Sequence, residues 1–232
     1  MVTGGTGVVG RAVCEALLAQ GAQVHATGVV DAEMDAFAGE FPGVRLHRVD
    51  LTDARHCHEA YSALPSLWAS IHCAGGFVYG AIEQATDESV TGMFDMNALT
   101  AFNASRQAVR VMRERASTQT GAVDPRTVGG RIVNIAGRPA VEPAAGFSAY
   151  AMAKSAVIAL TRTLSVELAP EGICVNAVVP SVIDTPVNRA AMPGAEFSKW
   201  VQPSELASQI LELASPASHA TGQVVPVYGG LA

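Results

Sequence analysis

The chain has 232 residues, of which 49% are hydrophobic and 16% charged, so it can form one large domain with a substantial buried core. Its formal net charge of -6 and its scattered lysines and arginines exclude the basic surfaces with which proteins bind nucleic acid or anionic membranes. No run of about 18 apolar residues is present, so no membrane-spanning helix is expected.

The chain opens with a glycine-rich segment, "MVTGGTGVVGRAV", in which Gly4, Gly7 and Gly10 precede an expected helix. Glycines permit the dihedral angles of a tight turn, and such a turn at a helix N-terminus can bind the pyrophosphate of a dinucleotide. A turn without a ligand is the alternative for this pattern alone. Because a usual strand has about five residues, we expect either a truncated first strand or residues missing ahead of Met1.

Short β-branched segments then alternate with stretches of helical length, such as "GRAVCEALLAQG". The predicted strands are 22–27, 44–49, 69–74, 131–136, 173–179 and 224–227. Several of them are apolar on both faces, which requires helices on both sides of a parallel sheet. With right-handed crossovers, residues 1–232 are predicted to form a single α/β domain with a doubly wound parallel sheet.

Two segments have the composition of loops. Residues 116–129 are polar and contain Gly, Thr and Pro, so we expect a flexible surface loop there. Residues 183–203 contain prolines together with Met192, Phe197 and Trp200, whose side chains we expect to be exposed. Because loops at the C-terminal ends of parallel strands form the binding crevice, 183–203 is predicted to be a lid over a ligand.

Tyr150 and Lys154 stand four residues apart at the start of a helical pattern, so their side chains share one helix face. An ammonium group close to a phenol favours the phenolate and lowers the pKa of tyrosine from about 10. Tyr150 is therefore predicted to be a general acid or base. A plain surface helix is the alternative for this pair in isolation.

Seven segments, in order along the whole chain, resemble the short-chain dehydrogenase/reductase family. They are "TGGTGVVG" (3–10), "VDLTD" (49–53), "CAGG" (73–76), Asn97 in "FDMNALTAF", "YAMAK" (150–154), "VNAVVPSVIDTP" (175–186) and "TGQVVPVYGG" (221–230). The resemblance implies a Rossmann-type fold, a nicotinamide dinucleotide, and hydride transfer to or from a carbonyl, imine or related centre.

By this resemblance, the cofactor-binding residues are Gly4, Thr6, Gly7, Gly10, Asp50, Leu51, Ala74, Gly75, Tyr150, Lys154, Pro180 and Thr185. The glycines of the first turn would hold the pyrophosphate. Asp50 and Leu51 would lie against the adenine, and Pro180 and Thr185 would flank the nicotinamide. The implied cofactor is NAD or NADP.

The resemblance also implies three catalytic residues: Tyr150, Lys154 and Asn97. Tyr150 would exchange the proton. Lys154 would lower the pKa of Tyr150 and bind the nicotinamide ribose, and Asn97 would support a water relay. No metal is expected, since His56 and His58 lie on different faces of the helix predicted there.

The end of the second predicted strand should distinguish NAD from NADP. An acidic residue there would bind the ribose 2′-hydroxyl of NAD, whereas a nearby arginine would favour NADP. This position is Gly28, followed by Val29. Asp31 could reach back to the ribose and Arg11 could approach a 2′-phosphate, but either could equally be an ordinary surface charge. The preference stays open at this point.

Gly137 stands where the family usually has a serine that orients the substrate oxygen. Losing one such donor costs about 100- to 1000-fold in rate with an unactivated carbonyl, so Gly137 argues against ordinary alcohol oxidation. Ser148 and Ser181 are candidate substitutes, and a structural role is the alternative for each.

Residues 135–154 and 184–200 also resemble the dihydropteridine reductases within this family, which have a small residue at the serine position. Their quinonoid substrates are already activated, so hydride delivery plus one proton can suffice. We therefore predict a reductase of an activated carbonyl, imine or quinonoid substrate, with Tyr150 as the proton donor. Phe77, Phe197 and Trp200 are candidate covers for a flat ring.

A dinucleotide-binding sensor or scaffold of the same fold, with weak or no turnover, is the alternative function. Gly137 favours it, whereas Tyr150, Lys154 and Asn97 together speak against it. The expected partner is a small-molecule substrate, and analogy with the family predicts a homodimer or homotetramer. The N-terminus lacks a signal-peptide pattern and the cysteines form no C-x-x-C pair, so a cytoplasmic location is predicted.

Overall fold

A computed structural model describes residues 1–117 and 129–231 of the chain. Within these residues, seven parallel strands form one sheet in the order β3-β2-β1-β4-β5-β6-β7. The strands are β1 (Val2–Thr3), β2 (His25–Gly28), β3 (Arg45–Arg48), β4 (Ala69–His72), β5 (Arg131–Ile135), β6 (Cys174–Pro180) and β7 (Val224–Val227). The strand order reverses between β1 and β4, and such a reversal opens a ligand crevice at the C-terminal strand ends.

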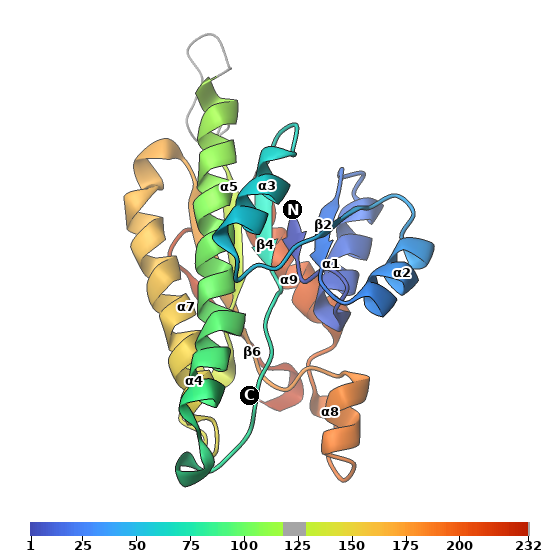
Figure 1. Cartoon of the computed structure of the whole chain (residues 1–232), viewed down its shortest axis with the longest axis vertical. Coiled ribbons are helices and arrows are strands. Elements are labelled where there is room, and N and C mark those ends of the chain that lie inside the picture. Colours follow the sequence, from blue (N-terminus) through green and yellow to red (C-terminus); the bar gives the residue numbers. More distant parts are fainter. Residues whose placement is uncertain (118–128, 232) are drawn as a thin grey trace.

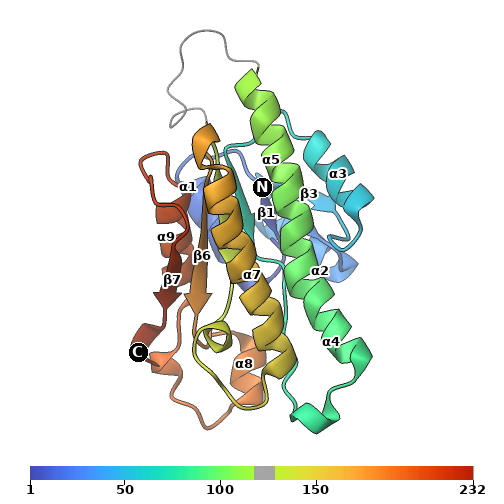
Figure 2. The ribbon, with the colours of Figure 1, turned by 90° about the vertical axis from the view of Figure 1, so that its left-hand side faces the viewer.

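Helices cover both faces of the sheet (Figure 1). They are α1 (Val8–Ala19), α2 (Asp31–Glu40), α3 (Ala54–Ser62), α4 (Asp87–Phe94), α5 (Thr100–Ser117), α7 (Ser148–Glu167), α8 (Pro186–Ala191) and α9 (Pro203–Ala214). Helices α5 and α7 lie side by side on one face, with α3 beside α5, and α1 packs against α9 on the other (Figure 2). Among residues 1–117 and 129–231, no helix combines the length and apolar character needed to cross a bilayer.

The sheet is buried on both faces because its central strands are apolar on both. Ile132 and Val133 are neighbours in β5 and belong to two different core clusters, since successive side chains of a strand point to opposite faces. One cluster contains Val133 and Ile210 of α9, and the other contains Ile132 and Leu168. Together the two layers make the single doubly wound domain that the sequence predicts.

The predicted elements are found with shifted ends. All six predicted strands are present, and the short first strand, β1, pairs with β2 and β4. The loop predicted over 116–129 falls mostly outside the described residues, and α5 continues to Ser117.

Arg131 joins the N-terminal end of β5 to the chain that follows α9. Its side chain is fully buried, with 1% of its surface exposed, and its guanidinium donates to the carbonyls of Ser218 (2.7 Å) and Gly130 (3.0 Å). It also lies over the ring of Trp68, 4.8 Å from the centroid, and the indole N–H of Trp68 donates to the carbonyl of Ala214 at 2.9 Å. These contacts fix the C-terminal end of α9 to the sheet.

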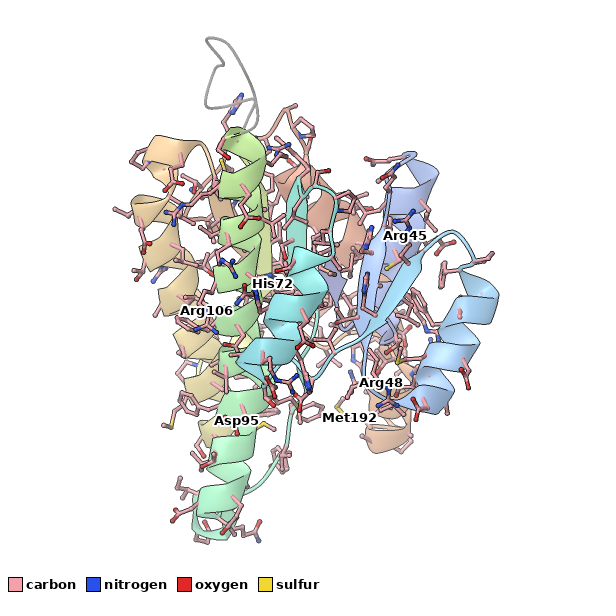
Figure 3. All side chains as sticks on the ribbon, turned by 45° about the horizontal axis from the view of Figure 1, so that its top comes forward. Arg45, Arg48, His72, Asp95, Arg106 and Met192 are labelled. Carbon is pink, nitrogen blue, oxygen red and sulfur yellow. The ribbon has the colours of Figure 1, made fainter. Side chains whose placement is uncertain are left out.

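A chain of buried polar side chains crosses the molecule from α3 to α7 through the sheet: Tyr61, Ser70, His72, Asn134 and Thr161. His72, in the middle of the molecule (Figure 3), has Nδ1 at 2.7 Å from Oδ1 of Asn134, which can only accept. Nε2 of His72 is therefore the acceptor for the Ser70 hydroxyl at 2.9 Å. At the far end, Thr161 donates to the carbonyl of Val157, so the chain ties α7 to β4 and β5.

This arrangement predicts a loss of stability in acid. Burial lowers the pKa of His72 from its ordinary value of 6.5 to about 4. The folded protein therefore binds a proton at His72 less readily than the unfolded chain, and its stabilisation is complete above pH 6.5 and is lost as the pH falls toward 4. A denaturant titration of the wild type should give a free energy of unfolding about 2 kcal/mol lower at pH 4.5 than at pH 7 from this group.

A His72→Asn variant should depend less on pH over this range, even if it is less stable throughout. The exposed His219 offers the matched control, and His219→Asn should retain the wild-type dependence. Equal pH dependence in His72→Asn and the wild type would show that His72 is not responsible.

Candidate active site

In the glycine-rich turn between β1 and α1, backbone segments lie too close together for side chains at Gly4 and Gly10. Gly4 has φ +61°, and a Cβ on it would lie 2.7 Å from the backbone nitrogen of Ala74, two residues after β4. A Cβ on Gly10 would overlap the Gly4 carbonyl, whereas Gly7 has only the Gly4 oxygen nearby, at 3.5 Å. Gly7 caps α1 without a side-chain hydrogen bond, and the first helical turn has no acidic residue. The free amides at this helix N-terminus therefore fit the pyrophosphate of a dinucleotide.

Asn97 lies in a π-helical turn, η2 (Asp95–Leu99), which joins α4 to α5. Its Nδ2 donates to the carbonyls of Gly76 and Met93, both at 3.0 Å, and its Oδ1 accepts from the Gly76 amide at 3.3 Å. A Cβ on Gly75 would lie 2.6 Å from Oδ1 of Asn97 and 3.3 Å from Nζ of Lys154. The loop after β4 thus packs directly on Asn97 and Lys154.

Tyr150 and Lys154 lie together on the first turns of α7, as their spacing predicts. Lys154 is 5% exposed, its Nζ donates to the carbonyl of Ile135 at 2.7 Å, and it lies 5.9 Å from the ring centroid of Tyr150. Burial lowers the pKa of Lys154 to about 8 and raises the pKa of Tyr150 to about 12.

The direction of the Tyr150 shift corrects the sequence prediction. We expected the ammonium of Lys154 to lower the pKa of the phenol, but this ammonium is bound to the Ile135 carbonyl and the desolvation of the phenol prevails. Tyr150 is therefore protonated at neutral pH, which is the form that can donate a proton.

Gly137 follows β5 and faces the hydroxyl of Tyr150. Its backbone is extended, with φ -170° and ψ 149°, which any residue can adopt. A Cβ on Gly137 would lie 2.5 Å from the Tyr150 hydroxyl oxygen and 3.1 Å from Cε1 of the same ring. The tyrosine thus occupies the space that a side chain at position 137 would need.

The two candidate substitutes for a serine at this position have other surroundings. The Ser181 hydroxyl donates its proton to the carbonyl of Tyr228 at 2.9 Å, so it does not donate to a substrate oxygen in this arrangement. Ser148, at the start of α7, lines an outer cleft with Phe147 and Ala151.

Aromatic rings surround Tyr150. Its ring centroid lies 6.1 Å from that of Phe77 and 6.2 Å from that of Phe147, and these two phenylalanines are 6.2 Å apart. Tyr79 meets Phe147 edge to face at 5.4 Å. The sequence indicates Phe77 but misses Phe147. Phe147 follows a turn at Gly146, which has φ +79°, and no sequence motif marks this turn. These rings form an apolar aromatic cluster around the ring of Tyr150.

The segment 183–203 carries α8 and a short 3-10 helix, η5 (Phe197–Lys199). Arg189 donates two hydrogen bonds to Asp184, at 2.6 and 2.7 Å, and lies over the ring of Phe197. Trp200 corrects the prediction of an exposed side chain, because it is only 4% exposed and packs on Phe197, with centroids 4.7 Å apart. Met192 is exposed as predicted.

The remaining predicted residues lie at the C-terminal strand ends. Pro180 is the last residue of β6, and Thr185 caps α8 by accepting from the Asn188 amide at 3.1 Å. Asp50, just after β3, accepts from the amide and hydroxyl of Thr52, and these hydrogen bonds lower the pKa of Asp50. Leu51 is buried. The sheet thus brings the predicted residues to one edge of the molecule.

Three comparisons with known proteins agree with this geometry. The model of the short chain dehydrogenase family matches residues 1–195. The short-chain dehydrogenase fogB of Aspergillus ruber is 31% identical, over 99% of this chain and 94% of that protein. L-xylulose reductase of Bos taurus is 29% identical over the same shares. The structure of a short-chain type dehydrogenase/reductase from Mycobacterium ulcerans has a TM-score of 0.88 at 27% identity, covering 99% of this chain and 88% of that one.

Proposed function

The chain belongs to the short-chain dehydrogenase family and is an NAD(P)-dependent oxidoreductase, and from this premise we propose that it reduces an activated planar substrate of the quinonoid, dihydropterin-like type. Activated carbonyls and imines are the wider substrate class. The observation that carries the proposal is that the hydroxyl of Tyr150 occupies the space that a Cβ at position 137 would need.

The reaction needs one hydride and one proton. NADH or NADPH, when bound, supplies the hydride. Tyr150 donates the proton from its hydroxyl, which burial keeps protonated. Lys154 is held by the Ile135 carbonyl beside the ring of Tyr150, where its ammonium can offset the negative charge that the phenolate gains when the proton leaves. Asn97 positions the loop after β4 through Gly76.

The substrate class follows from the number of donors at the reacting oxygen or nitrogen. A second hydroxyl would stabilise the charge that develops on an unactivated carbonyl, and Gly137 supplies none. An electron-poor quinonoid ring develops less localised charge, so one donor can suffice. The rings of Phe77 and Phe147 beside Tyr150 favour a flat aromatic substrate over a flexible polyol, because ring faces stack favourably.

Analogy with the family predicts that copies pair through the helix that bears Tyr150 and through residues 203–232, and exposed apolar side chains on α7 and its neighbour α5 support an assembly at this face. Met152 and Val166 of α7 and Phe102 of α5 are exposed. Apolar side chains that two helices present to solvent favour an interface. A homodimer or homotetramer stays a prediction by analogy with the family, and this surface supports it.

The test is oxidation of NADH and NADPH by the purified protein with quinonoid dihydropterin, a benzoquinone and L-xylulose as acceptors. We expect turnover of the first two at least about 100-fold faster than of L-xylulose, since the sugar ketone needs the second donor. Fast reduction of L-xylulose alone would replace the proposal by a sugar reductase. Cofactor binding without turnover of any acceptor would favour the sensor.

Comparing Gly137→Ser with Gly137→Ala distinguishes the effect of a hydroxyl at position 137 from the effect of the space that a side chain takes there. Both variants place a Cβ against Tyr150, but only serine adds a donor. We expect both to lower the rate with the dihydropterin equally, because the Tyr150 hydroxyl must move aside. With L-xylulose, serine should exceed alanine by about tenfold or more. A serine variant that also exceeds alanine on the dihydropterin would contradict a substrate that needs one donor only.

A further inference from the structure

The end of β2 has no room for a side chain. Gly28 is the last residue of this strand, and a Cβ on it would lie 2.7 Å from Cγ2 of Thr6 and 2.8 Å from Cγ of Met34. A charged side chain that distinguishes the ribose 2′-hydroxyl of NAD from the 2′-phosphate of NADP therefore cannot come from the end of β2. It must come from a neighbouring element.

Helix α2 supplies a carboxylate at this place. Glu33, in the first turn of α2, accepts a hydrogen bond from the hydroxyl of Thr6 at 3.1 Å. Thr6 lies inside the glycine-rich turn and is buried, so Glu33 is held against the turn that fits the dinucleotide. The side chain that fills the space at Gly28 is thus also the one that positions the carboxylate.

The cations near this end of β2 are already paired. The guanidinium of Arg11 contacts Glu40 and donates to the carbonyl of Thr6 at 2.9 Å, and Arg48 at the end of β3 pairs with Asp31. Figure 3 shows Arg48 at the site end of β3, with Arg45 at the opposite end of the strand. Two cations are balanced by two carboxylates. Among residues 1–117 and 129–231, the Glu33 carboxylate accepts from the Thr6 hydroxyl and forms no ion pair, and Arg11 reaches Glu33 through the backbone carbonyl, at 3.5 Å. The local charge is therefore negative.

We infer that Glu33 makes this site prefer NADH to NADPH. A carboxylate can accept a hydrogen bond from the ribose 2′-hydroxyl of NADH, whereas the 2′-phosphate of NADPH adds about two negative charges and would be repelled. The inference rests on the proposed function, since it concerns the cofactor of the same site. It assigns to α2 the discrimination that β2 cannot provide.

The test measures binding and needs no turnover. NADH and NADPH are titrated separately into the purified protein, and the fluorescence of the reduced nicotinamide reports each Kd. We expect NADH to bind at least about tenfold more tightly at low ionic strength. Glu33→Gln keeps an oxygen that can accept from Thr6 and removes the charge, so it should tighten NADPH binding by about tenfold and leave the NADH Kd nearly unchanged.

Asp35→Asn is the matched control. Asp35 is exposed on the same helix, and this substitution removes one negative charge, as Glu33→Gln does. It should leave the ratio of the two Kd values as in the wild type. Tighter binding of NADPH by the wild type would overturn the inference and would indicate that Arg48 leaves Asp31 for the phosphate. An equal effect of the two variants would also overturn it. If neither cofactor binds, the proposed function fails together with the inference.

Discussion

A Tyr150→Phe variant is expected to lose about 100- to 10,000-fold in kcat for reduction of the activated substrate, because it removes the proton donor. The phenylalanine ring keeps the packing against Phe77 and Phe147, so the fold should be unchanged. The measurement is the steady-state rate of NADH oxidation, together with the Kd of NADH from fluorescence titration. A loss confined to kcat would assign Tyr150 to the chemical step.

Tyr79→Phe is the matched control for this substitution. Tyr79 is 67% exposed and touches Phe147 through its ring, so loss of its hydroxyl should leave kcat nearly unchanged. Should Tyr150→Phe retain kcat within about tenfold of the wild type, a water molecule rather than Tyr150 would be the proton source.

Arg131→Met is expected to lower the free energy of unfolding by about 3 kcal/mol, the largest effect on stability that we predict. Methionine fills much of the same volume but cannot donate to the buried carbonyls of Ser218 and Gly130. Unsatisfied buried acceptors cost about 1 to 3 kcal/mol each. For a chain of this size the loss corresponds to a fall in Tm of about 6 to 12 °C, measurable by calorimetry.

Arg113→Met provides the comparison for Arg131→Met. Arg113 pairs with Glu171 at 2.6 Å, but its side chain is 52% exposed, so its removal should cost less than about 1 kcal/mol. Equal losses in the two variants would mean that the carbonyls around position 131 find water as a replacement donor. Arg131 lies at the opposite end of the sheet from the candidate active site, so the Kd of NADH should stay the same in both variants.

The sequence indicates the fold because the pattern that builds it is local. Segments that are apolar on both faces alternate with helical stripes, and these patterns predict every long strand. The strand ends are less predictable, as β2 illustrates. The sequence predicts a strand over 22–27, whereas the structure has His25–Gly28, because the ends depend on pairing with β1 and β3. Such pairing joins segments that are distant in the chain.

The candidate site likewise has features that the local sequence predicts and features that depend on the fold. Tyr150 and Lys154 share a helix face, and their spacing alone predicts this. The raised pKa of Tyr150 depends on burial by residues from other elements, so the spacing gave the wrong direction. Glu33 and Phe147 were missed because their partners, Thr6 and Phe77, are brought near by the fold and not by the local sequence.

The π-helical turn at Asn97 gives the segment between α4 and α5 a fixed length. A π-helical turn holds about one residue more than an α-helical turn, because its hydrogen bonds join residues five apart instead of four apart. Deleting a single codon within 95–99 would remove the extra residue and leave a regular helix, so α4 and α5 would keep their orientation, but the widened turn that holds Asn97 against Gly76 would be lost. A change in the length of this segment would therefore affect the candidate site even if every remaining side chain were kept.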